Sequence, residues 1–411
     1  MKACRTNPVW LLCGVALALR AGWIAYRWAT HGAALDYPDE ELHWQLATNL
    51  LHTGRLVTDD GRLAARMPLY PLFLAVFAAL GPASILAARM AQAVSGAATV
   101  LVAYRLADAA LGRRAAVVGG LLIGCDPFGI FFTNLLLSEV LFTFLALALL
   151  GCAWRLCAAA DPPRRAAVGL ALLGPAAVLT RPSCAALIPL VWLLVLGLAP
   201  QRRRLAPWLL LCPLALVLLV LPWGLRNKAV LGDYAWLSTN GGVTLYDAQG
   251  PQANGASDQT FLRTMPAFQD LGEVALDRTL KRQALDQMRA DPARVLRLAG
   301  IKFLRTWSPV PNVSEYRGGA VAWAGAAYTL GVLLLAVIGL VRSLCDRARP
   351  ELRRFQALLW LPVLYFTFLH CVYIGSVRYR VPLLPFLSLA AAAAAFAIRP
   401  ITASKTPVLS S

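Results

Sequence analysis

The sequence predicts an all-α polytopic membrane protein, and two observations carry this prediction. Of its 411 residues, 59% are hydrophobic, and the mean hydropathy is +0.61. The apolar residues form long runs, whereas the strands of a membrane β-barrel would alternate apolar and polar residues. We therefore expect a bundle of membrane-spanning helices.

About ten spans are expected, because ten apolar runs approach the length of about 20 residues that crosses a bilayer core. The runs are residues 8–30, 84–109, 114–134, 138–158, 166–180, 183–199, 206–222, 320–341, 355–374 and 381–398. A further apolar segment, residues 68–81, is interrupted by proline and is too short to span. We expect it to be a re-entrant or interfacial helix.

Arginine supplies most of the formal net charge of +18, and its positions predict the orientation of the spans. Basic residues gather in alternate short loops and near both termini, which marks the cytoplasmic side and argues for membrane topology rather than nucleic-acid binding. These residues are Lys2, Arg5, Arg113, Arg114, Arg164, Arg165, Arg202, Arg203, Arg204, the segment 342–354, Arg399 and Lys405. Both termini are therefore expected on the cytoplasmic side of the membrane. The first run could also be a signal peptide, but it continues past Arg20 to Trp28, which favours an uncleaved helix.

Three parts follow from this arrangement. Residues 1–222 form an N-terminal transmembrane core with the first outer loop at 31–67, residues 223–318 form a long extracytoplasmic region, and residues 319–411 form C-terminal transmembrane helices with a short cytoplasmic tail. The long region is expected to contain helices around 268–290 and 292–306. The second of these is amphipathic, which predicts a place at the membrane interface.

Four acids in six residues, Asp36, Asp39, Glu40 and Glu41, directly follow the first expected span. One interpretation is helix capping, with Asp36 as the N-cap, since acids near a helix N-terminus satisfy its amides and its dipole. The other interpretation is catalysis, because one cap needs only one or two acids. A carboxylate near a low-dielectric region can also have its pKa raised towards that of a general base.

Arginines also occur on the side expected to face outward, namely Arg66, Arg181, Arg226, Arg378 and Arg380. Each one alone is explained by snorkelling to the interface or by pairing with lipid phosphate. Together they would form a basic rim around the carboxylates. Such a rim is what a reaction that expels a lipid-linked phosphate needs.

Two further polar residues lie at or within expected spans. Glu139 begins a span, where it is either a cap residue or, as a charge at membrane depth, a functional residue. His370 lies in an apolar run and is either a packing residue or a ligand contact. No zinc-ligand spacing, nucleotide-type glycine loop or CxxC pair among the nine cysteines occurs, so no metal site or cofactor is expected, with a divalent cation left as an open alternative.

An ordered series of short motifs resembles a known family. The motifs are Asp39-Glu40 with Ala47, Asn49-Leu50 to Gly54, Arg66-Met67-Pro68-Leu69-Tyr70-Pro71, Leu137-Ser138-Glu139, Thr180-Arg181-Pro182, Pro222-Trp223-Gly224-Leu225-Arg226-Asn227, Ser238-Thr239-Asn240-Gly241-Gly242, and His370 with Arg378-Tyr379-Arg380-Val381-Pro382. In this order they resemble the bacterial members of the dolichyl-phosphate-mannose protein mannosyltransferase family, within the C-type glycosyltransferase superfamily that also includes lipid A aminoarabinose transferases. Two departures occur: His43 stands where the family usually has tyrosine, and Met67-Pro68 keeps one of two usual prolines.

The resemblance implies a C-type glycosyltransferase fold and an inverting hexosyl or pentosyl transfer from a polyprenyl-phosphate sugar. Asp39 would take the proton from the acceptor hydroxyl, with Glu40 as the rival base. The five arginines would stabilise the donor phosphate, with Arg181, Arg378 and Arg380 foremost. The residues that would contact the sugar or the acceptor are Tyr70, Glu139, Asn240, His370 and Tyr379. The acceptor would be a lipid, a glycan or a protein at the outer face of a bacterial inner membrane.

A transporter or flippase of lipid-linked or anionic solutes is the main alternative, since intramembrane arginines and a broken helix suit one. The long outer loop, the acids outside the bilayer midplane and the lack of internal repeats favour the enzyme. A non-catalytic scaffold would not explain the ordered motifs. The sugar, the acceptor and the oligomeric state are left open by the sequence.

Overall fold

The computed structural model describes residues 7–159, 163–313 and 317–396, and every regular element in these ranges is a helix. This confirms the all-α prediction. The helices of the bundle are α1 (Pro8–His31), α4 (Ser84–Leu111), α5 (Arg113–Gly124), α6 (Pro127–Thr133), α7 (Glu139–Ala158), α8 (Arg164–Thr180), α9 (Leu187–Leu198), α10 (Arg202–Leu209), α11 (Leu211–Leu231), α17 (Gly319–Cys345), α18 (Pro350–Val372) and α20 (Leu384–Phe396). The basic residues expected near the termini, Lys2, Arg5, Arg399 and Lys405, lie outside the described residues.

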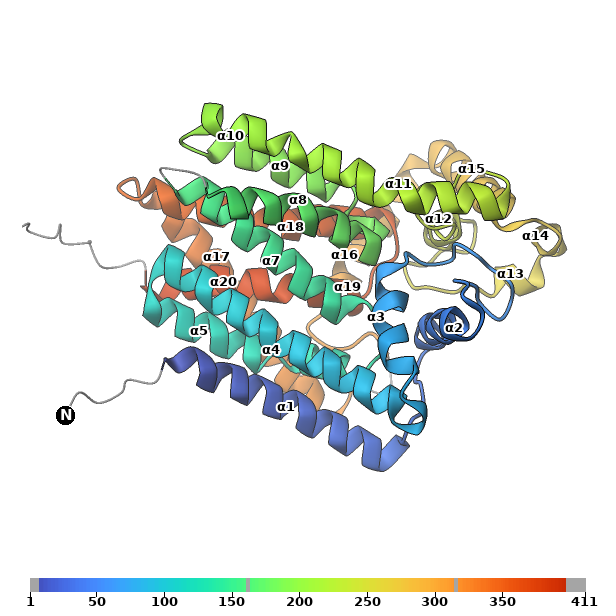
Figure 1. Ribbon diagram of the computed structural model, residues 1–411, viewed down its shortest axis with the longest axis horizontal. Coiled ribbons are helices and arrows are strands. Elements are labelled where there is room, and N and C mark those ends of the chain that lie inside the picture. The colour runs from blue at the N-terminus through green and yellow to red at the C-terminus, as the bar shows by residue number, and fades with distance from the viewer. Residues whose placement is uncertain (1–6, 160–162, 314–316, 397–411) are drawn as a thin grey trace, which may run out of the picture.

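Six helices of the described ranges are long and apolar enough to cross a membrane, or seven if the bent pair α5 and α6 counts as one span. Each of the ten predicted runs contains a helix. However, α8, α9 and the described part of α20 have only 17, 12 and 13 residues, so the expected number of ten spans is not confirmed. The long helices run side by side along the long axis of the molecule (Figure 1).

The span formed by α5 and α6 is broken, and a buried arginine compensates for the break. Asp126 begins α6 as its N-cap, accepting a hydrogen bond from the N–H of Phe128 at 3.0 Å. The carbonyls of Ile123 and Gly124 accept hydrogen bonds from Arg20 of α1, at 3.3 and 3.0 Å. Since unpaired carbonyls are costly inside a membrane, these contacts account for a charge within the bundle.

Small residues let α20 lie deep in the bundle, between α5 and α17. A Cβ at Gly339 of α17 would lie only 2.1 Å from the carbonyl oxygen of Ala390. Residues 389–394 of α20 are buried. Close backbone approach of this kind is typical of small residues at helix contacts in membrane proteins.

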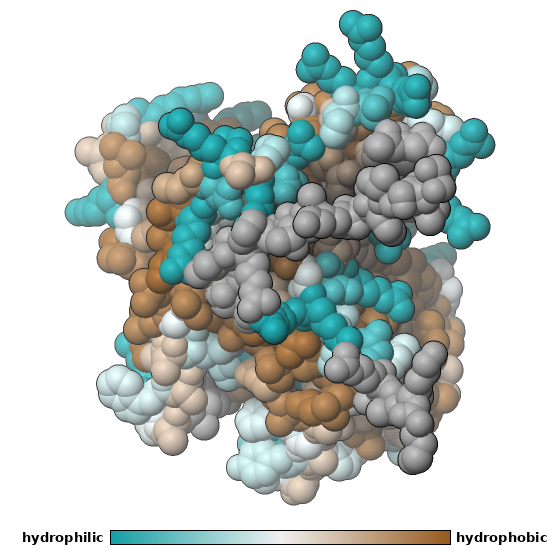
Figure 2. Space-filling view, turned by 90° about the vertical axis from the view of Figure 1, so that its left-hand side faces the viewer, coloured by the Kyte–Doolittle hydropathy of each residue, from teal (hydrophilic) through white to brown (hydrophobic). Residues whose placement is uncertain are grey.

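Charged side chains distinguish the two ends of the bundle. Exposed arginines in the first turns of α5, α8 and α10 lie at one end. Figure 2 shows this end from the front, with several groups of hydrophilic side chains on it. The acidic segment after α1 lies at the opposite end (Figure 1). The alternation expected from the sequence is therefore present. Which side of a membrane each end faces stays a prediction.

The remaining helices cover the acidic end. They are α2 (Pro38–Thr53), α3 (Leu69–Ala78), α12 (Gly241–Gln249), α13 (Phe261–Thr264), α14 (Pro266–Gln269), α15 (Glu273–Ala290), α16 (Pro292–Thr306) and α19 (Val377–Arg380). α2 and α3 lie across the bundle axis, as expected for the interrupted segment 68–81 (Figure 1). α15 and α16 agree with the two helices expected in the long region, whereas α12 falls in a Gly/Asn-rich stretch where none was expected. α11 continues to Leu231, and the division into three parts stays a prediction.

One glutamate ties the long region to the first outer loop. The carboxylate of Glu273, in the first turn of α15, accepts the N–H groups of Leu63 and Ala64 at 2.8 and 2.9 Å. It also accepts the hydroxyl of Thr239, whose own N–H donates to the Ala64 carbonyl at 2.9 Å. The backbone just before Arg66 is therefore fixed from both sides.

α16 turns its basic side toward the protein. Arg294, Lys302 and Arg305 donate hydrogen bonds to backbone carbonyls of neighbouring segments. On the other side, Leu296 and Leu304 are 75% and 70% exposed. Exposed leucines fit a helix at the membrane interface, while the basic side holds the loop that follows α18.

Candidate active site

Arg378 on α19 joins two acids from distant parts of the chain. Its Nε donates to Oε1 of Glu139, at the start of α7. Its NH1 group donates to Oδ2 of Asp39, in the first turn of α2. Arg378, a predicted phosphate ligand, therefore joins the predicted base Asp39 to the predicted contact residue Glu139.

Asp39 is held by two guanidinium groups. Arg66 donates from NH2 to Oδ1 at 2.6 Å, and Arg378 contacts the other oxygen. Burial alone would raise the pKa of Asp39, but the charges of Arg66 and Arg378 outweigh it and hold that pKa well below its usual range. The carboxylate is therefore ionised at neutral pH. The side chain is also 35% exposed, so a substrate can reach it.

Glu139 lies deeper and is completely buried. Arg181 NH1 lies 2.9 Å from Oε1, the same oxygen that Arg378 contacts. The second oxygen, Oε2, is buried and has no hydrogen-bond partner among the described residues. Since an unpaired buried oxygen costs free energy, it is a candidate acceptor for a substrate hydroxyl.

Asp39, Arg66, Glu139, Arg181 and Arg378 form what we call the charge cluster. Its three guanidinium groups face two carboxylates, which leaves one positive charge in excess. Such an excess attracts an anion, and the fork of an arginine matches the oxygens of a phosphate group. The cluster can thus hold a phosphate next to an exposed carboxylate.

Two aromatic rings form a wall beside the charge cluster. Tyr379 stacks on His370, with ring centroids 4.1 Å apart and an interplanar angle of 9°. The guanidinium carbons of Arg181 and Arg378 lie 5.9 and 6.0 Å from the Tyr379 ring. His370 Nδ1 lies 3.0 Å from the carbonyl oxygen of Ile374, which fixes the orientation of the imidazole. The wall offers a flat apolar surface at the edge of an anion site.

The loop before α19 is held in place by the long region, and this positions Arg378. The N–H of Val377 donates to Oδ1 of Asn312 at 2.7 Å. Arg305 of α16 donates to the carbonyl of Gly375 at 3.2 Å. These side chains satisfy backbone groups around the short loop that joins α18 to α19.

Glu40, the rival base, binds only backbone. Its Oε1 accepts the N–H groups of Asp36 and Tyr37 at 3.0 and 3.2 Å, and its Oε2 accepts the N–H of Leu136 at 2.7 Å. Burial raises the pKa of Glu40, and these backbone hydrogen bonds oppose that rise. The N-cap of α2 is Tyr37, so the expectation that Asp36 caps this helix is wrong. Asp36 pairs instead with Arg27 at 2.6 Å.

Arg226 and Asn240 make their contacts away from the charge cluster. Arg226 donates to the carbonyls of Leu56 and Leu63, and so holds the first outer loop. Asn240 precedes α12 and donates to the hydroxyl of Thr244 at 3.1 Å. Their predicted roles toward the substrates are not among these contacts and stay predictions.

Arg380 and Tyr70 are buried behind the charge cluster. Arg380 donates to the carbonyl of Ser308 and to the hydroxyl of Thr329, inside the bundle. Tyr70 donates from its hydroxyl to Oε1 of Gln92 at 3.0 Å. In this structure both side chains support the elements that carry the cluster.

His43 belongs to the site, although the sequence singled it out only as a departure from the family pattern. It follows Asp39 by four residues and therefore shares its helix face. The imidazole is only 4% exposed and meets the Tyr70 ring edge-on, with centroids 4.9 Å apart. Burial, reinforced by the nearby arginine charges, lowers the pKa of His43 to about 3, so the ring is neutral. The four-residue spacing was the signal that could have found it.

Among the described residues, no three His, Cys, Asp or Glu side chains gather as the ligands of a metal ion would. The positive charge that lies between the carboxylates of Asp39 and Glu139 is the guanidinium of Arg378, which pairs with both.

Comparison with known proteins relates this site to a family. Residues 65–224, less than half of the chain, match the sequence model of the family described as dolichyl-phosphate-mannose-protein mannosyltransferase. The matched segment contains Arg66, Glu139 and Arg181 of the charge cluster. No curated protein sequence matches the chain.

Solved structures share the fold. The apo oligosaccharyltransferase of Archaeoglobus fulgidus has a TM-score of 0.60 and 11% identity, over 95% of this chain and 51% of that one. The same organism's AglB, in complex with an inhibitory peptide and a dolichol-phosphate, has a TM-score of 0.59 and 13% identity, over 94% and 49%. ArnT from Cupriavidus metallidurans bound to undecaprenyl phosphate has a TM-score of 0.48 and 16% identity, over 94% and 78%.

The chain thus spans about half the length of the archaeal oligosaccharyltransferase. The resemblance drawn from the sequence is confirmed over residues 65–224, and the chain shares the fold of the archaeal oligosaccharyltransferase. The chain is a multi-pass membrane protein similar to the dolichyl-phosphate-mannose-protein mannosyltransferases.

The contacts of Glu40 predict that Glu40→Gln lowers the free energy of unfolding by about 1–3 kcal/mol, because one amide oxygen cannot satisfy three backbone N–H groups. Thermal unfolding in detergent measures this loss as a lower Tm. Glu41→Gln is the matched control: Glu41 lies in the same helical turn and is exposed, so its replacement should cost less than about 1 kcal/mol. Equal losses in both variants would contradict the structural role of Glu40.

Proposed function

We propose that the protein is an integral-membrane inverting glycosyltransferase that moves a sugar from a polyprenyl-phosphate donor to an acceptor hydroxyl. The observation that carries this proposal is the charge cluster, in which the partly exposed, ionised carboxylate of Asp39 pairs with two arginines and a third arginine pairs with the neighbouring Glu139. The similar archaeal oligosaccharyltransferase was solved with a dolichol-phosphate, which is a lipid phosphate of the kind this cluster would accept.

The reaction is a single displacement at the anomeric carbon. The acceptor oxygen attacks that carbon as Asp39 takes its proton, and the bond from the anomeric carbon to the phosphate oxygen breaks. The bonding electrons leave with the polyprenyl phosphate, so no proton has to be supplied to the leaving group. Arg378 and Arg181 stabilise the charge that develops on the phosphate. Attack from the face opposite the leaving group inverts the configuration.

Donor binding also activates the base. Arg66 and Arg378 neutralise Asp39. A donor phosphate competes for the same guanidinium groups, and every contact that it takes weakens the hold on the carboxylate. The pKa of Asp39 then rises, because burial is no longer outweighed by the two positive charges. The carboxylate becomes a stronger base only when the donor is present.

The neighbouring groups suit the sugar. The unpaired Oε2 of Glu139 would accept a sugar hydroxyl, and the wall of Tyr379 and His370 would pack against the ring. Asp39 is the better candidate for the base than Glu40, because Glu40 is completely buried and hydrogen-bonds only to backbone N–H groups, whereas the side chain of Asp39 is 35% exposed.

The setting would be a bacterial inner membrane, with both termini in the cytoplasm and the charge cluster on the extracytoplasmic side. The separation of the basic loops from the acidic end supports this orientation. The high alanine, arginine and leucine content is typical of GC-rich bacterial genomes. The transferred group would be a hexose or a pentose, and the acceptor would be a lipid, a glycan or a protein.

Asp39→Asn is expected to lower the transfer rate by a factor of about 10²–10⁴, the usual contribution of a general base, while donor binding is retained. Purified protein in nanodiscs, radiolabelled polyprenyl-phosphate sugars and membrane extract as acceptor measure the transfer. Glu41→Gln, two residues away and exposed, should remain active. Equal transfer by wild type and Asp39→Asn would remove Asp39 from the mechanism. Movement of the labelled lipid across liposome bilayers without transfer would favour the transporter.

Activation of the base by the donor predicts that kcat and kcat/KM fall at two different acidic pH values, which we call their acid limits. Activity is lost as the pH falls through the pKa of Asp39, because the protonated carboxyl cannot take a proton. The limit in kcat/KM reports the free enzyme and should lie below the usual aspartate range, whereas the limit in kcat reports the donor complex and should lie higher. Arg66→Gln should raise the kcat/KM limit by about one pH unit or more, since it removes one of the two charges that lower this pKa.

The control for this measurement is Arg55→Gln, which removes an exposed arginine outside the charge cluster. It should leave both limits in place. Coincident limits for kcat and kcat/KM in the wild type would show that the donor does not release Asp39.

A further inference from the structure

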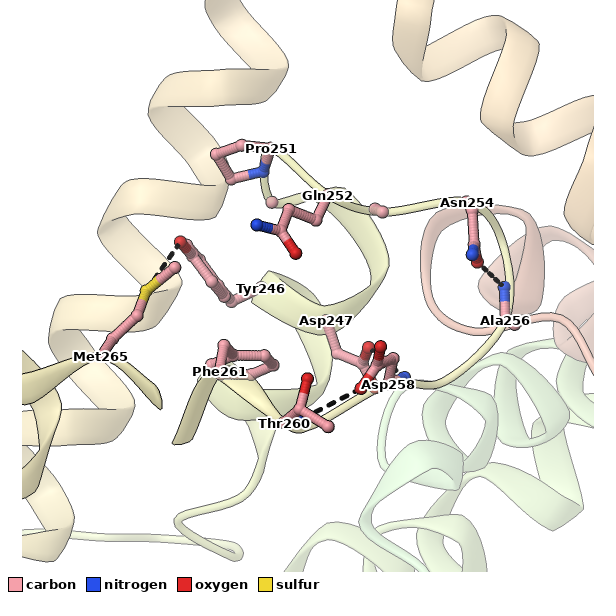
Figure 3. A pocket seen from close by; sticks show the side chains of 12 residues that line it. Tyr246, Asp247, Pro251, Gln252, Asn254, Ala256, Asp258, Thr260, Phe261 and Met265 are labelled. Carbon is pink, nitrogen blue, oxygen red and sulfur yellow. Dashed lines mark hydrogen bonds between the residues drawn. The ribbon is translucent and has the colours of Figure 1, made fainter. Parts of the chain in front are cut away.

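A second site lies in the long region, apart from the charge cluster. An open hollow lies between the end of α12, the segment 250–260 and α13 (Figure 3), and the space in it that a water-sized molecule can occupy is about 40 Å³. A ligand larger than a few water molecules would therefore lie across the open mouth of the hollow, against its wall. No residue of the charge cluster lines it.

The lining of the hollow combines aromatic surface with neutral and acidic polar groups. The rings of Tyr246 and Phe261 lie edge to face with centroids 4.9 Å apart, and Figure 3 shows them facing the same space as the Gln252 amide. Asn254 and Asp258 add further polar groups at the rim. Aromatic faces pack against the C–H side of a sugar ring, and amides and carboxylates bind its hydroxyls.

The charge of the lining decides which ligands fit. Two carboxylates, those of Asp247 and Asp258, are among the residues that line the hollow, and no lysine or arginine is. The two carboxylates disfavour a phosphate or another anion inside the hollow, while the charge of Arg294 lies behind the wall, where it binds the carbonyls of Gly250 and Pro251. A neutral ligand rich in hydroxyl groups meets no such penalty.

The hollow is rigid before any ligand binds. Arg294 of α16 donates to the carbonyls of Gln249, Gly250 and Pro251, at 2.9, 2.5 and 3.3 Å. From the other side, Asp247 accepts the N–H of Asp258 at 2.8 Å. A wall fixed in this way loses little conformational entropy on binding, which favours affinity.

Hydrogen bonds also connect the wall of the hollow to the end of α18, next to His370. Gln249, the last residue of α12, donates to the carbonyl of Val372 at 2.6 Å, and Lys302 donates to the same carbonyl at 2.8 Å. Val372 ends α18 and lies two residues after His370. α12 and α13 lie at the same end of the molecule as α2 (Figure 1). A ligand in the hollow would therefore sit at the catalytic end.

We propose that this hollow is a saccharide subsite for the acceptor, so that the acceptor is a glycan rather than a peptide. The inference rests on the proposed glycosyl transfer. The donor sugar is bonded to its phosphate and lies at the charge cluster, so a neutral sugar in the hollow belongs to the other substrate. Its hydroxyls meet Gln252, Asn254 and Asp258, while its ring packs against Phe261.

Saturation-transfer NMR on the wild type in nanodiscs, without donor, tests the subsite directly. The probes are methyl glycosides and disaccharides of neutral hexoses, with a Ser/Thr-containing peptide as the alternative ligand. Asp258→Asn and Phe261→Ala should weaken saccharide binding at least tenfold. Asp286→Asn, which alters an exposed acid on α15, should leave it unchanged. The proposal is overturned if no saccharide binds, if both pocket variants bind as the wild type does, or if the peptide binds and the pocket variants weaken it.

Steady-state transfer separates this proposal from the proposed function. Asp258→Asn should raise KM for the acceptor about tenfold while KM for the donor stays as in the wild type. Transfer with an unchanged acceptor KM would overturn the subsite and leave the glycosyltransferase in place. Saccharide binding that the pocket variants abolish, in a protein that transfers no sugar, would overturn the proposed function and support a saccharide site.

Discussion

The ion pairs of Arg378 are the interaction on which the rest of the structure depends. They bring the first turn of α2, the start of α7 and the loop after α18 to one point, although these segments lie far apart in the chain. A buried charge without its partner is strongly destabilising, so each segment has to be placed accurately. Glu40, Glu273 and Asn312 do this by satisfying the backbone of the loops that carry the cluster.

We propose two kinds of binding surface at the same end of the bundle. The charge cluster carries one excess positive charge and suits a lipid phosphate, while the hollow beside α12 contains carboxylates and no basic residue. Under the proposed function, these charges would sort the two substrates. Asp39, the proposed base, is neutralised by Arg66 and Arg378, of which Arg378 would also bind the donor, so the donor would be needed to make it a stronger base.

The sequence predicted the charge cluster well, because charged residues beside apolar runs are rare in membrane proteins and stand out for that reason. It could not predict that Glu40 and Arg380 use their charges on backbone groups, since those contacts depend on how distant loops approach. α12 was missed for a similar reason. A Cβ at Gly242 would lie 1.9 Å from the carbonyl oxygen of Asp277, so this glycine allows tertiary packing where composition alone predicts a loop. The number of spans is not confirmed, because apolar runs do not reveal the length of the helices that they form.

The central claim is that the charge cluster binds the phosphate of a polyprenyl lipid. The most direct measurement is the affinity of undecaprenyl phosphate for the protein in nanodiscs, for wild type and for Arg378→Gln. Arg347→Gln, an exposed arginine at the other end of the bundle, is the control. We expect at least tenfold weaker binding in Arg378→Gln, about 1.4 kcal/mol or more, and wild-type affinity in the control. Equal affinity of all three proteins would contradict the central claim.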